Sequence, residues 1–152
     1  MKKLRVLFVC IGNACRSQMA EGFARHLGSE LVDAESAGMM PLASVPAQTR
    51  QVMLEKGMPI DSQYPKGIEI FRNSEFDLVV NMSGIELPKG LKERERRWVV
   101  ADPYGRSDGA FRQVRDDLEG RVRTLLMEIQ DAKGKVPAPV PPRRRLFSFG
   151  KS

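Results

Sequence analysis

The feature that most constrains the fold is an apolar run at residues 4–10, which leads through a short glycine-containing loop into a helical pattern. Such a nearly continuous run is typical of a strand buried on both faces of a parallel sheet. Beyond the loop, apolar residues recur at helical spacing, with Ser17 as the expected N-cap and Gly28 as the expected stop. The pattern predicts a strand, a tight loop and a helix that meet at Cys10 and Arg16.

The rest of the chain alternates further strands with helices. The sequence predicts strands at 31–37, 77–82 and 98–101, helices at about 44–57 and 108–129 with a short one near 68–72, and a solvated connection at 86–97. Parallel strands need connections of about a dozen residues or more, which helices supply. We therefore expect an α/β fold, a doubly wound four-stranded parallel sheet of strand order 2-1-3-4 with helices on both faces.

The net charge of +6 belongs to one end of the chain. Residues 133–152 hold six basic residues and no acidic one, so the remainder has 25 − 6 = 19 basic residues against 19 acidic ones. We expect one folded domain at 1–132 that does not bind nucleic acid, followed by a basic, proline-rich, disordered tail at 133–152. The alternative to a solvated tail is a peptide that contacts a membrane surface or a partner.

Cysteine and histidine usage narrows the classes of chemistry. The two cysteines lie five residues apart, which fits neither a disulfide framework nor a zinc ligand set, so no metal and no cofactor are expected. The single histidine, His26, falls off the apolar stripe of its helix, which disfavours a Cys-His protease. Because no signal peptide precedes the first strand, we expect a cytoplasmic protein.

The loop between the first strand and helix suits an oxyanion such as phosphate or arsenate. Its backbone N–H groups can form an anion-binding nest at the positive end of the helix, and Arg16 adds a planar fork of donors. The same positive field favours the thiolate form of Cys10 and makes it a nucleophile. The simpler alternative is a buried strand-end cysteine beside a surface arginine. The residues expected to surround the anion are Ile11, Gly12, Asn13, Ala14, Cys15, Arg16 and Ser17.

The segment Val9-Cys10-Ile11-Gly12-Asn13-Ala14-Cys15-Arg16-Ser17 resembles the signature of the low-molecular-weight protein tyrosine phosphatases, whose fold the thioredoxin-coupled arsenate reductases share. Met19-Ala20-Glu21, Ser36-Ala37-Gly38 and Ala101-Asp102-Pro103-Tyr104 extend the resemblance over about residues 4–130. It implies Cys10 as nucleophile, Arg16 as phosphate clamp and Asp102 as general acid. It also implies that Asn13 and Ser17 support the loop and the thiolate.

Three further positions have two interpretations each, and a fourth departs from the family pattern. Asp102 is either a general acid or part of an Asp-Pro turn, and Tyr104 is either a wall of the substrate cleft or a loop-packing residue. Leu42 stands where the phosphatases often carry a large aromatic residue opposite Tyr104, which weakens one wall for phosphotyrosine. Cys15 is either inert packing or a redox partner of Cys10.

A cation site is not expected. Glu21, Ser36 and Asn13 resemble potassium-binding positions of some arsenate reductases. However, Pro65-Lys66 occupies the place of a further acidic ligand.

Three functions compete. The first is a phosphomonoesterase that acts on phosphotyrosine proteins or small aryl phosphates through a cysteinyl-phosphate intermediate, with Asp102 protonating the leaving group. The alternative is an arsenate reductase that depends on an external thiol or a glutaredoxin-like partner, because Met82 and Ser83 stand where a relay would need cysteines. The third, a catalytically idle anion-binding module, is disfavoured because nucleophile, clamp and acid are all present.

Overall fold

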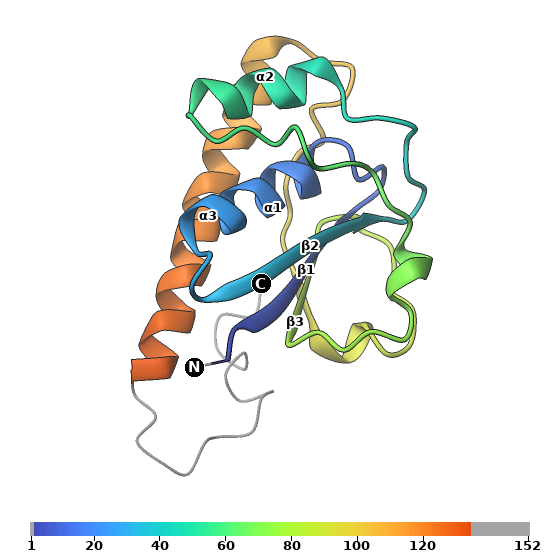
Figure 1. Cartoon of the computed structure of the whole chain (residues 1–152). Coiled ribbons are helices and arrows are strands. Elements are labelled where there is room, and N and C mark those ends of the chain that lie inside the picture. The colour runs from blue at the N-terminus through green and yellow to red at the C-terminus, as the bar shows by residue number, and fades with distance from the viewer. Residues whose placement is uncertain (1, 135–152) are drawn as a thin grey trace.

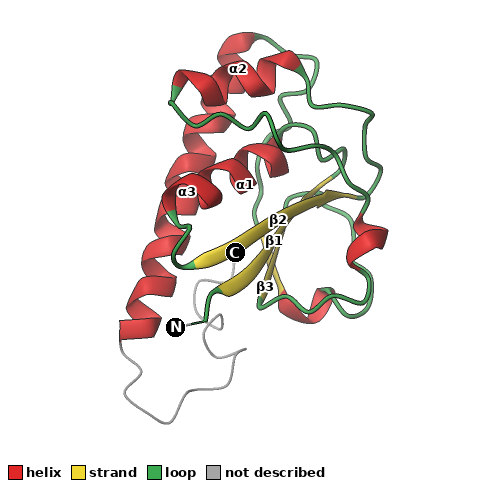
Figure 2. Ribbon diagram, viewed as in Figure 1, coloured by secondary structure: helices red, strands yellow, loops and turns green. Residues whose placement is uncertain are grey.

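In the computed structural model, which describes residues 2–134, four parallel strands form one sheet in the order β2-β1-β3-β4 (Figure 2). The strands are β1 (Leu4–Cys10), β2 (Val32–Gly38), β3 (Leu78–Asn81) and β4 (Glu95–Arg97). Strand β1 pairs on one side with β2, placing Cys10 opposite Gly38, and on the other side with β3. The predicted four-stranded parallel sheet of order 2-1-3-4 is therefore confirmed.

Helices cover both faces of the sheet, but unequally. The α-helices α1 (Arg16–Leu27), α2 (Ala47–Glu55) and α3 (Asp108–Gly134) lie on one face, and the 3₁₀-helices η1 (Ile68–Phe71) and η2 (Lys92–Arg94) lie on the other (Figure 1). Helix α3 packs along α1 and also contacts α2. The face covered by α1, α2 and α3 is thus a packed helical layer, whereas the opposite face is covered by short 3₁₀-helices and loops.

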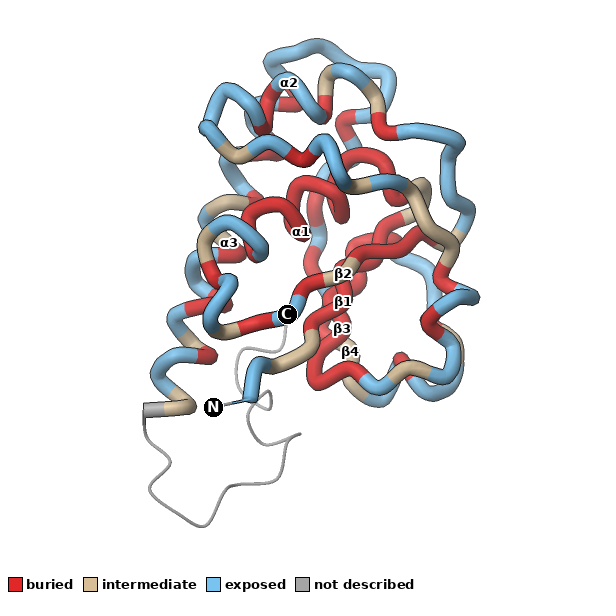
Figure 3. The backbone as a smooth tube through the Cα atoms, viewed as in Figure 1, coloured by how far each residue is buried: buried red, intermediate tan, exposed pale blue. Residues whose placement is uncertain are grey.

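Alternation along β1 divides the core between these two faces. Val6 and Phe8 point into the cluster under the three α-helices, and Leu7 and Val9 point into the cluster around η1. Their side chains are fully buried, and Figure 3 shows the continuous red centre of the sheet. Each cluster removes apolar surface from water, so the first strand stabilises the fold through both faces at once.

The fourth strand differs from the prediction. It lies at Glu95–Arg97, inside the segment expected to be a solvated connection, and pairs with β3 through Val79 opposite Glu95 and Asn81 opposite Arg97. The apolar segment 98–101 lies outside the ladder. Trp98 and Val100 of this segment are buried in the cluster to which α3 also contributes, whereas Val99 is 89 % exposed, and the charged residues of β4 suit a short edge strand because they discourage further pairing.

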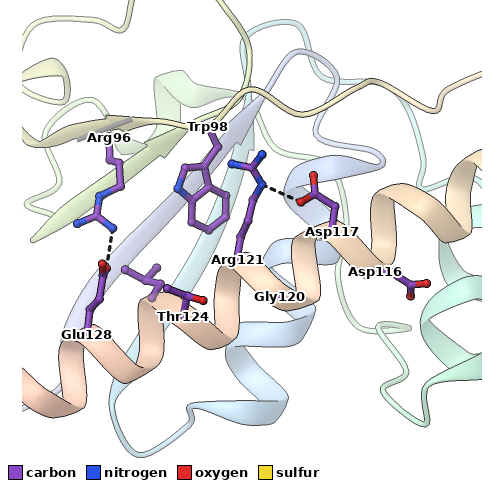
Figure 4. Close-up of a pocket in the computed structure, with 9 residues that line it drawn as sticks. Arg96, Trp98, Asp116, Asp117, Gly120, Arg121, Thr124 and Glu128 are labelled. Atoms are coloured by element: carbon purple, nitrogen blue, oxygen red, sulfur yellow. Dashed lines mark hydrogen bonds and ion pairs between the residues drawn. The ribbon is translucent and has the colours of Figure 1, made fainter. Parts of the chain in front are cut away.

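The packing of β4 on α3 explains this difference. Arg96 is buried and donates to Glu128 of α3 at 2.8 Å, and Trp98 is also buried beside the same helix (Figure 4). Arg121 lies over the Trp98 ring at 5.8 Å and pairs with Asp117 at 3.0 Å. A long arginine stem can cover apolar surface while its head group is paired, so a charged sequence forms a half-buried strand here.

Helix ends also differ from the sequence-based expectation. The helix α1 starts at Arg16, so Ser17 lies within its first turn rather than at the N-cap. Asp108 is the first residue of α3, and the hydroxyl of Ser107, the residue before it, accepts from Ala110 N at 3.2 Å. Gly28 ends α1 as predicted. Ser107 caps a helix and Ser17 does not, because their hydrogen-bond partners differ, and the local sequence pattern does not specify those partners.

The predicted boundary between domain and tail falls inside α3. This helix continues to Gly134, two residues beyond the expected end of the domain at 132. The remaining tail positions 135–152, for which the sequence predicts disorder or a contact with a membrane surface or partner, lie outside the described residues, as does Met1. Among the helices of residues 2–134, none combines the length and the apolar character needed to cross a membrane.

Candidate active site

The predicted site residues meet at the carboxyl edge of the sheet, where β1 lies between β2 and β3. This is the position at which strand order reverses, and it is where doubly wound sheets open a crevice. Cys10 ends β1 and Arg16 begins α1. A cavity of about 240 Å³ opens there, lined by Cys10, Ile11, Gly12, Ala14, Cys15, Arg16, Met40, Leu42, Asp102 and Tyr104. Asn13 and Ser17 lie outside this lining; Ser17 contacts the Cys10 sulfur, and Asn13 contacts Ser17.

A buried chain of polar groups supports the Cys10 sulfur. Cys10 Sγ lies 2.9 Å from Ser17 Oγ, and Asn13 Nδ2 donates to the same hydroxyl oxygen at 2.7 Å. The Ser17 oxygen accepts from Asn13 and can still donate its own hydrogen to the sulfur or accept one from it. The contact therefore serves either a thiolate, which accepts from the hydroxyl, or a thiol, which donates to it. Ser17 therefore contacts the sulfur, as the resemblance implied, instead of capping the helix.

The Arg16 guanidinium is oriented by two carbonyls. Its Nη1 donates to the carbonyl oxygens of Met82 at 2.8 Å and Val100 at 3.1 Å. Its Nε is buried and has no hydrogen-bond partner among residues 2–134, and Nη2 lies 3.6 Å from Asp102 Oδ2. A buried donor without a partner is unfavourable, and an oxyanion in the cavity would supply the acceptor. This arginine is thus held ready for an anion.

The carbonyl groups of the loop are all bonded to groups outside it. Cys10, Ile11 and Gly12 accept from the backbone N–H groups of Met39, Met40 and Leu42 at 3.1, 2.8 and 3.0 Å, while Asn13 and Ala14 accept from Gln18 Nε2 at 2.9 Å and Thr49 Oγ1 at 3.0 Å. In a trans peptide the C=O of one residue and the N–H of the next point in opposite directions. The N–H groups of residues 11–15 therefore face the inner side of the loop, where they can bind an anion.

Close backbone approach explains the glycine at the end of β2. A Cβ at Gly38 would lie 2.7 Å from the Ile11 carbonyl oxygen and 2.8 Å from Asn13 N. Asn13 itself has φ of 49°, the left-handed region that asparagine tolerates better than most residues. The Ser36-Ala37-Gly38 landmark thus allows the strand to pass directly against the anion loop.

Outside the loop, the cavity has a rim of exposed side chains. Leu42 lies against Gly12, where its Cγ would be 3.1 Å from a Cβ added to that glycine, and it is 38 % exposed. Met40 and Tyr104 are also exposed. Asp102 is half exposed, and its Oδ1 accepts from Tyr104 N at 3.1 Å. The rim therefore combines apolar side chains with one carboxylate at the mouth of the cavity.

Cys15 lies in the same loop in a different chemical environment. It is 3 % exposed, and burial raises the pKa of its thiol to about 11, although a hydrogen bond with Thr49 partly opposes this. At neutral pH the residue is a protonated thiol and a weak nucleophile. Its environment favours packing over a role as the redox partner of Cys10 in the resting enzyme.

The positions compared with a potassium site already have protein partners. Buried Glu21 accepts from the Ser36 hydroxyl and pairs with Arg25 at 2.6 Å. Asn13 Oδ1 accepts from the N–H of Lys66 at 2.8 Å. We therefore propose no cation site from these residues. In the part of the chain that the structure describes, no group of three or more His, Cys, Asp or Glu side chains could hold a metal ion.

Sequence reasoning missed the groups that orient the loop from outside. The backbone of 39–42 acts through N–H groups, which any sequence except proline supplies, so no residue signal exists for it. Gln18 and Thr49 act through side chains, but each contacts the loop only because the fold brings α1 and α2 to it. Their burial, 0 % exposure for both polar side chains, is visible only in the structure.

Comparison with known proteins places the chain among relatives of two named activities. A glutaredoxin arsenate reductase from Synechocystis sp. is 38 % identical over 133 residues, covering 85 % of this chain and 99 % of that protein. The solved structure of an arsenate reductase in the phosphate binding state has a TM-score of 0.77 at 36 % identity, covering 84 % and 99 % of the two chains. A low molecular weight protein tyrosine phosphatase from T. tengcongensis has a TM-score of 0.75 at 25 % identity, covering 83 % and 99 %.

A family model agrees with these likenesses. The model of the low molecular weight phosphotyrosine protein phosphatases matches residues 5–135, which include every predicted site residue. The matched region also spans all the strands and α-helices apart from Leu4, the first residue of β1. The chain belongs to the low molecular weight phosphotyrosine protein phosphatase family.

Proposed function

We propose that this protein is an arsenate reductase in which Cys10 is the nucleophile and an external thiol supplies the electrons. The observation that carries the proposal is the anion loop around Cys10, with its outward carbonyls and the buried Arg16 Nε that lacks an acceptor in residues 2–134. The 38 % identity to a glutaredoxin arsenate reductase favours arsenate over phosphate monoesters as the substrate. This reverses the ranking suggested by the sequence, which placed the phosphatase first.

The need for an external thiol follows from the position of the sulfur atoms. The sequence holds two cysteines, and Cys15 is buried with a pKa of about 11. After β3, where a relay would need cysteines, the chain has Met82 and Ser83, and Asn81 Oδ1 accepts from both the N–H and the hydroxyl of Ser83 at 2.9 and 2.6 Å. This turn is closed by hydrogen bonds and brings no thiol to Cys10, which favours a reductant from solution.

The proposed reaction balances with two thiols. The Cys10 thiolate attacks arsenic and one arsenate oxygen leaves as water, for which Asp102 supplies a proton. An external thiolate then attacks the Cys10 sulfur, the sulfur–arsenic bond breaks, and its electron pair stays on arsenic, which departs as arsenite. A second thiol opens the resulting mixed disulfide and restores Cys10. Two thiols become one disulfide for each two-electron reduction of arsenate.

A phosphomonoesterase is the second candidate, favoured by one specific observation. The Asp102 carboxylate lies at the mouth of the cavity, 3.6 Å from Arg16 Nη2 and beside exposed Tyr104. An acid at this point could protonate the departing alkoxide or phenoxide of a phosphate ester and then activate water. The same nucleophile and clamp would serve both reactions, and phosphate hydrolysis would need no thiol.

One experiment separates the two functions. In the first assay the protein is given arsenate with glutathione, glutaredoxin, glutathione reductase and NADPH. In the second it is given the same amount of arsenate with thioredoxin, thioredoxin reductase and NADPH. In the third it is given an aryl phosphate in the absence of any thiol. We expect Cys10-dependent NADPH consumption in the first assay and little in the second. Rapid aryl phosphate hydrolysis with no NADPH consumption in either reducing system would contradict the proposal and support the phosphatase.

A further inference from the structure

We infer that Gln18 and Thr49 are positioning residues that aim the backbone N–H groups of Ala14 and Cys15 at the bound oxyanion. Both side chains lie outside the anion loop, on α1 and α2. The inference rests on the anion-binding part of the proposed function and is independent of which reaction follows. Two residues outside the loop, Gln18 and Thr49, therefore orient peptide groups within it.

The first step is the difference among the five loop carbonyls. Three of them are held by backbone N–H groups of the segment 39–42, which substitution of a side chain leaves in place. The other two, on Asn13 and Ala14, are held by side chains. The orientation of these two peptide groups therefore depends on the identity of Gln18 and Thr49. Rotation of either peptide would turn a carbonyl oxygen toward the anion, where it would repel the negative charge.

Thr49 is the simpler of the two cases. Its hydroxyl donates to the Ala14 carbonyl oxygen at 3.0 Å across 35 residues of sequence, and its side chain is fully buried. Pinning this oxygen turns the next N–H, that of Cys15, toward the inner side of the loop. The hydroxyl also interacts with the Cys15 thiol. A hydroxyl on a second helix therefore fixes one peptide plane of the anion loop.

Gln18 holds the adjacent peptide with all of its amide groups engaged. Its Nε2 donates to the carbonyl oxygens of Asn13 at 2.9 Å and Tyr64 at 3.0 Å, and its Oε1 accepts from Gln63 Nε2 at 2.8 Å. The segment at 63–66 thus braces Gln18, and Gln18 braces Asn13. This matters because Asn13 has a positive φ, a conformation that persists only where its surroundings hold it.

The test measures anion binding without turnover. We expect inorganic phosphate to protect Cys10 from iodoacetamide, and the concentration that halves the alkylation rate, followed by mass spectrometry of the Cys10 peptide, gives its affinity. Thr49→Val keeps the shape and removes the hydroxyl, so we expect phosphate to bind about 10- to 150-fold more weakly, the range for loss of a hydrogen bond to a charged group, here that of Cys15 N–H to the anion. Gln18→Met should show a loss of similar size.

Rescue and matched controls distinguish positioning from general damage. Thr49→Ser restores the hydroxyl and should bind phosphate within about 3-fold of the parent, on the scale of a retained neutral hydrogen bond. Thr124→Val on the exposed face of α3 and Gln51→Met on the exposed face of α2 should change nothing. Parent-like phosphate affinity in Thr49→Val and Gln18→Met, or equal losses in Thr49→Val and Thr49→Ser, would overturn the inference. Failure of arsenate reduction alone would leave these binding results unaffected and would count only against the proposed function.

Discussion

Arg16 Nη2 lies 3.6 Å from Asp102 Oδ2, although the two residues are 86 positions apart in sequence. The same guanidinium donates to the carbonyl oxygens of Met82 and Val100, so one side chain contacts the chain after β3 and the chain that leads to Asp102. Arg16 therefore holds together the parts of the site that come from different crossovers. Cys10, Arg16 and Asp102 all line one cavity, so an anion bound there would contact the residues expected to act as nucleophile, clamp and acid.

Substitution of Cys10 separates binding from reaction. Cys10→Ser removes the nucleophile but leaves the loop N–H groups and Arg16, so we expect no detectable turnover of arsenate or aryl phosphate with phosphate affinity kept within about 10-fold. Arg16→Ala removes a charged donor pair and should lose both properties. Phosphate affinity of the two variants is measured by calorimetry beside the activity assays. Turnover that persists in Cys10→Ser would exclude Cys10 as the nucleophile.

Substitution of Asp102 tests proton transfer. Asp102→Asn keeps the shape of the side chain and its position beside Tyr104 N, but it removes the acid. We expect hydrolysis of a phosphate ester with a poor leaving group to fall by about 10²–10⁴-fold, the usual contribution of general acid catalysis, and hydrolysis of an activated ester to fall much less. The measurement is kcat across a series of leaving groups. Equal losses across the series would show that Asp102 has no acid role.

The first strand, anion loop and first helix are readable from the sequence because they are contiguous. Their signals, an apolar run, a Gly-Asn turn and a helical stripe, depend on neighbours a few residues apart. The strand order follows in the same way, since right-handed crossovers leave few arrangements for four parallel strands. The sequence alone therefore suffices to place Cys10 and Arg16 in one site.

Contacts between distant residues cannot be read in this way. Strand β4 is charged, and its buried Arg96 pairs with Glu128 of α3 at 2.8 Å. The support of Asn13 by Lys66 N spans 53 residues, and that of Ala14 by Thr49 spans 35. A hydrophobic pattern indicates that a residue is buried but not which element it packs against. The pattern therefore predicts that Trp98 lies within a strand, whereas β4 ends at Arg97, one residue earlier. These features depend on how the elements pack.

The contact between α2 and α3 gives the fold a stability that depends on pH. Arg112 and Arg115 of α3 both bind Glu55 of α2, and the hydrogen bond with Arg112, the largest effect, lowers the pKa of Glu55 to about 2 from an ordinary 4.5. The folded state favours the ionised carboxylate, so the pairing stabilises the protein fully above about pH 4.5, and this stabilisation is lost as the pH falls from there toward 2.

Glu55→Gln should therefore lower the Tm at pH 7 by roughly 1–3 °C, since surface pairs contribute modestly, and the difference from the parent should shrink steadily below about pH 4.5. Thermal unfolding followed by circular dichroism at several pH values measures this, with Glu30→Gln in an exposed turn as the control. A difference in Tm that stays constant from pH 7 to pH 3 would show that packing, rather than the ion pairs, accounts for the effect.

Substitution of Cys15 tests whether the electrons that reduce arsenate come from a second thiol of this chain or from an external thiol. An internal route would form a disulfide between Cys10 and Cys15, which would consume the nucleophile and require the loop carbonyls to give up their outward hydrogen bonds. The high pKa of Cys15, about 11, also makes its thiol a poor attacking group at neutral pH.

We therefore expect Cys15→Ser to keep arsenate reduction with glutathione and glutaredoxin within about 3-fold of the parent, a change well below one decade in rate. The assay follows NADPH consumption, and trapping of a Cys10–glutathione disulfide by mass spectrometry identifies the intermediate. Loss of arsenate reduction in Cys15→Ser, with phosphate affinity unchanged, would instead make Cys15 the resolving thiol and exclude the external route.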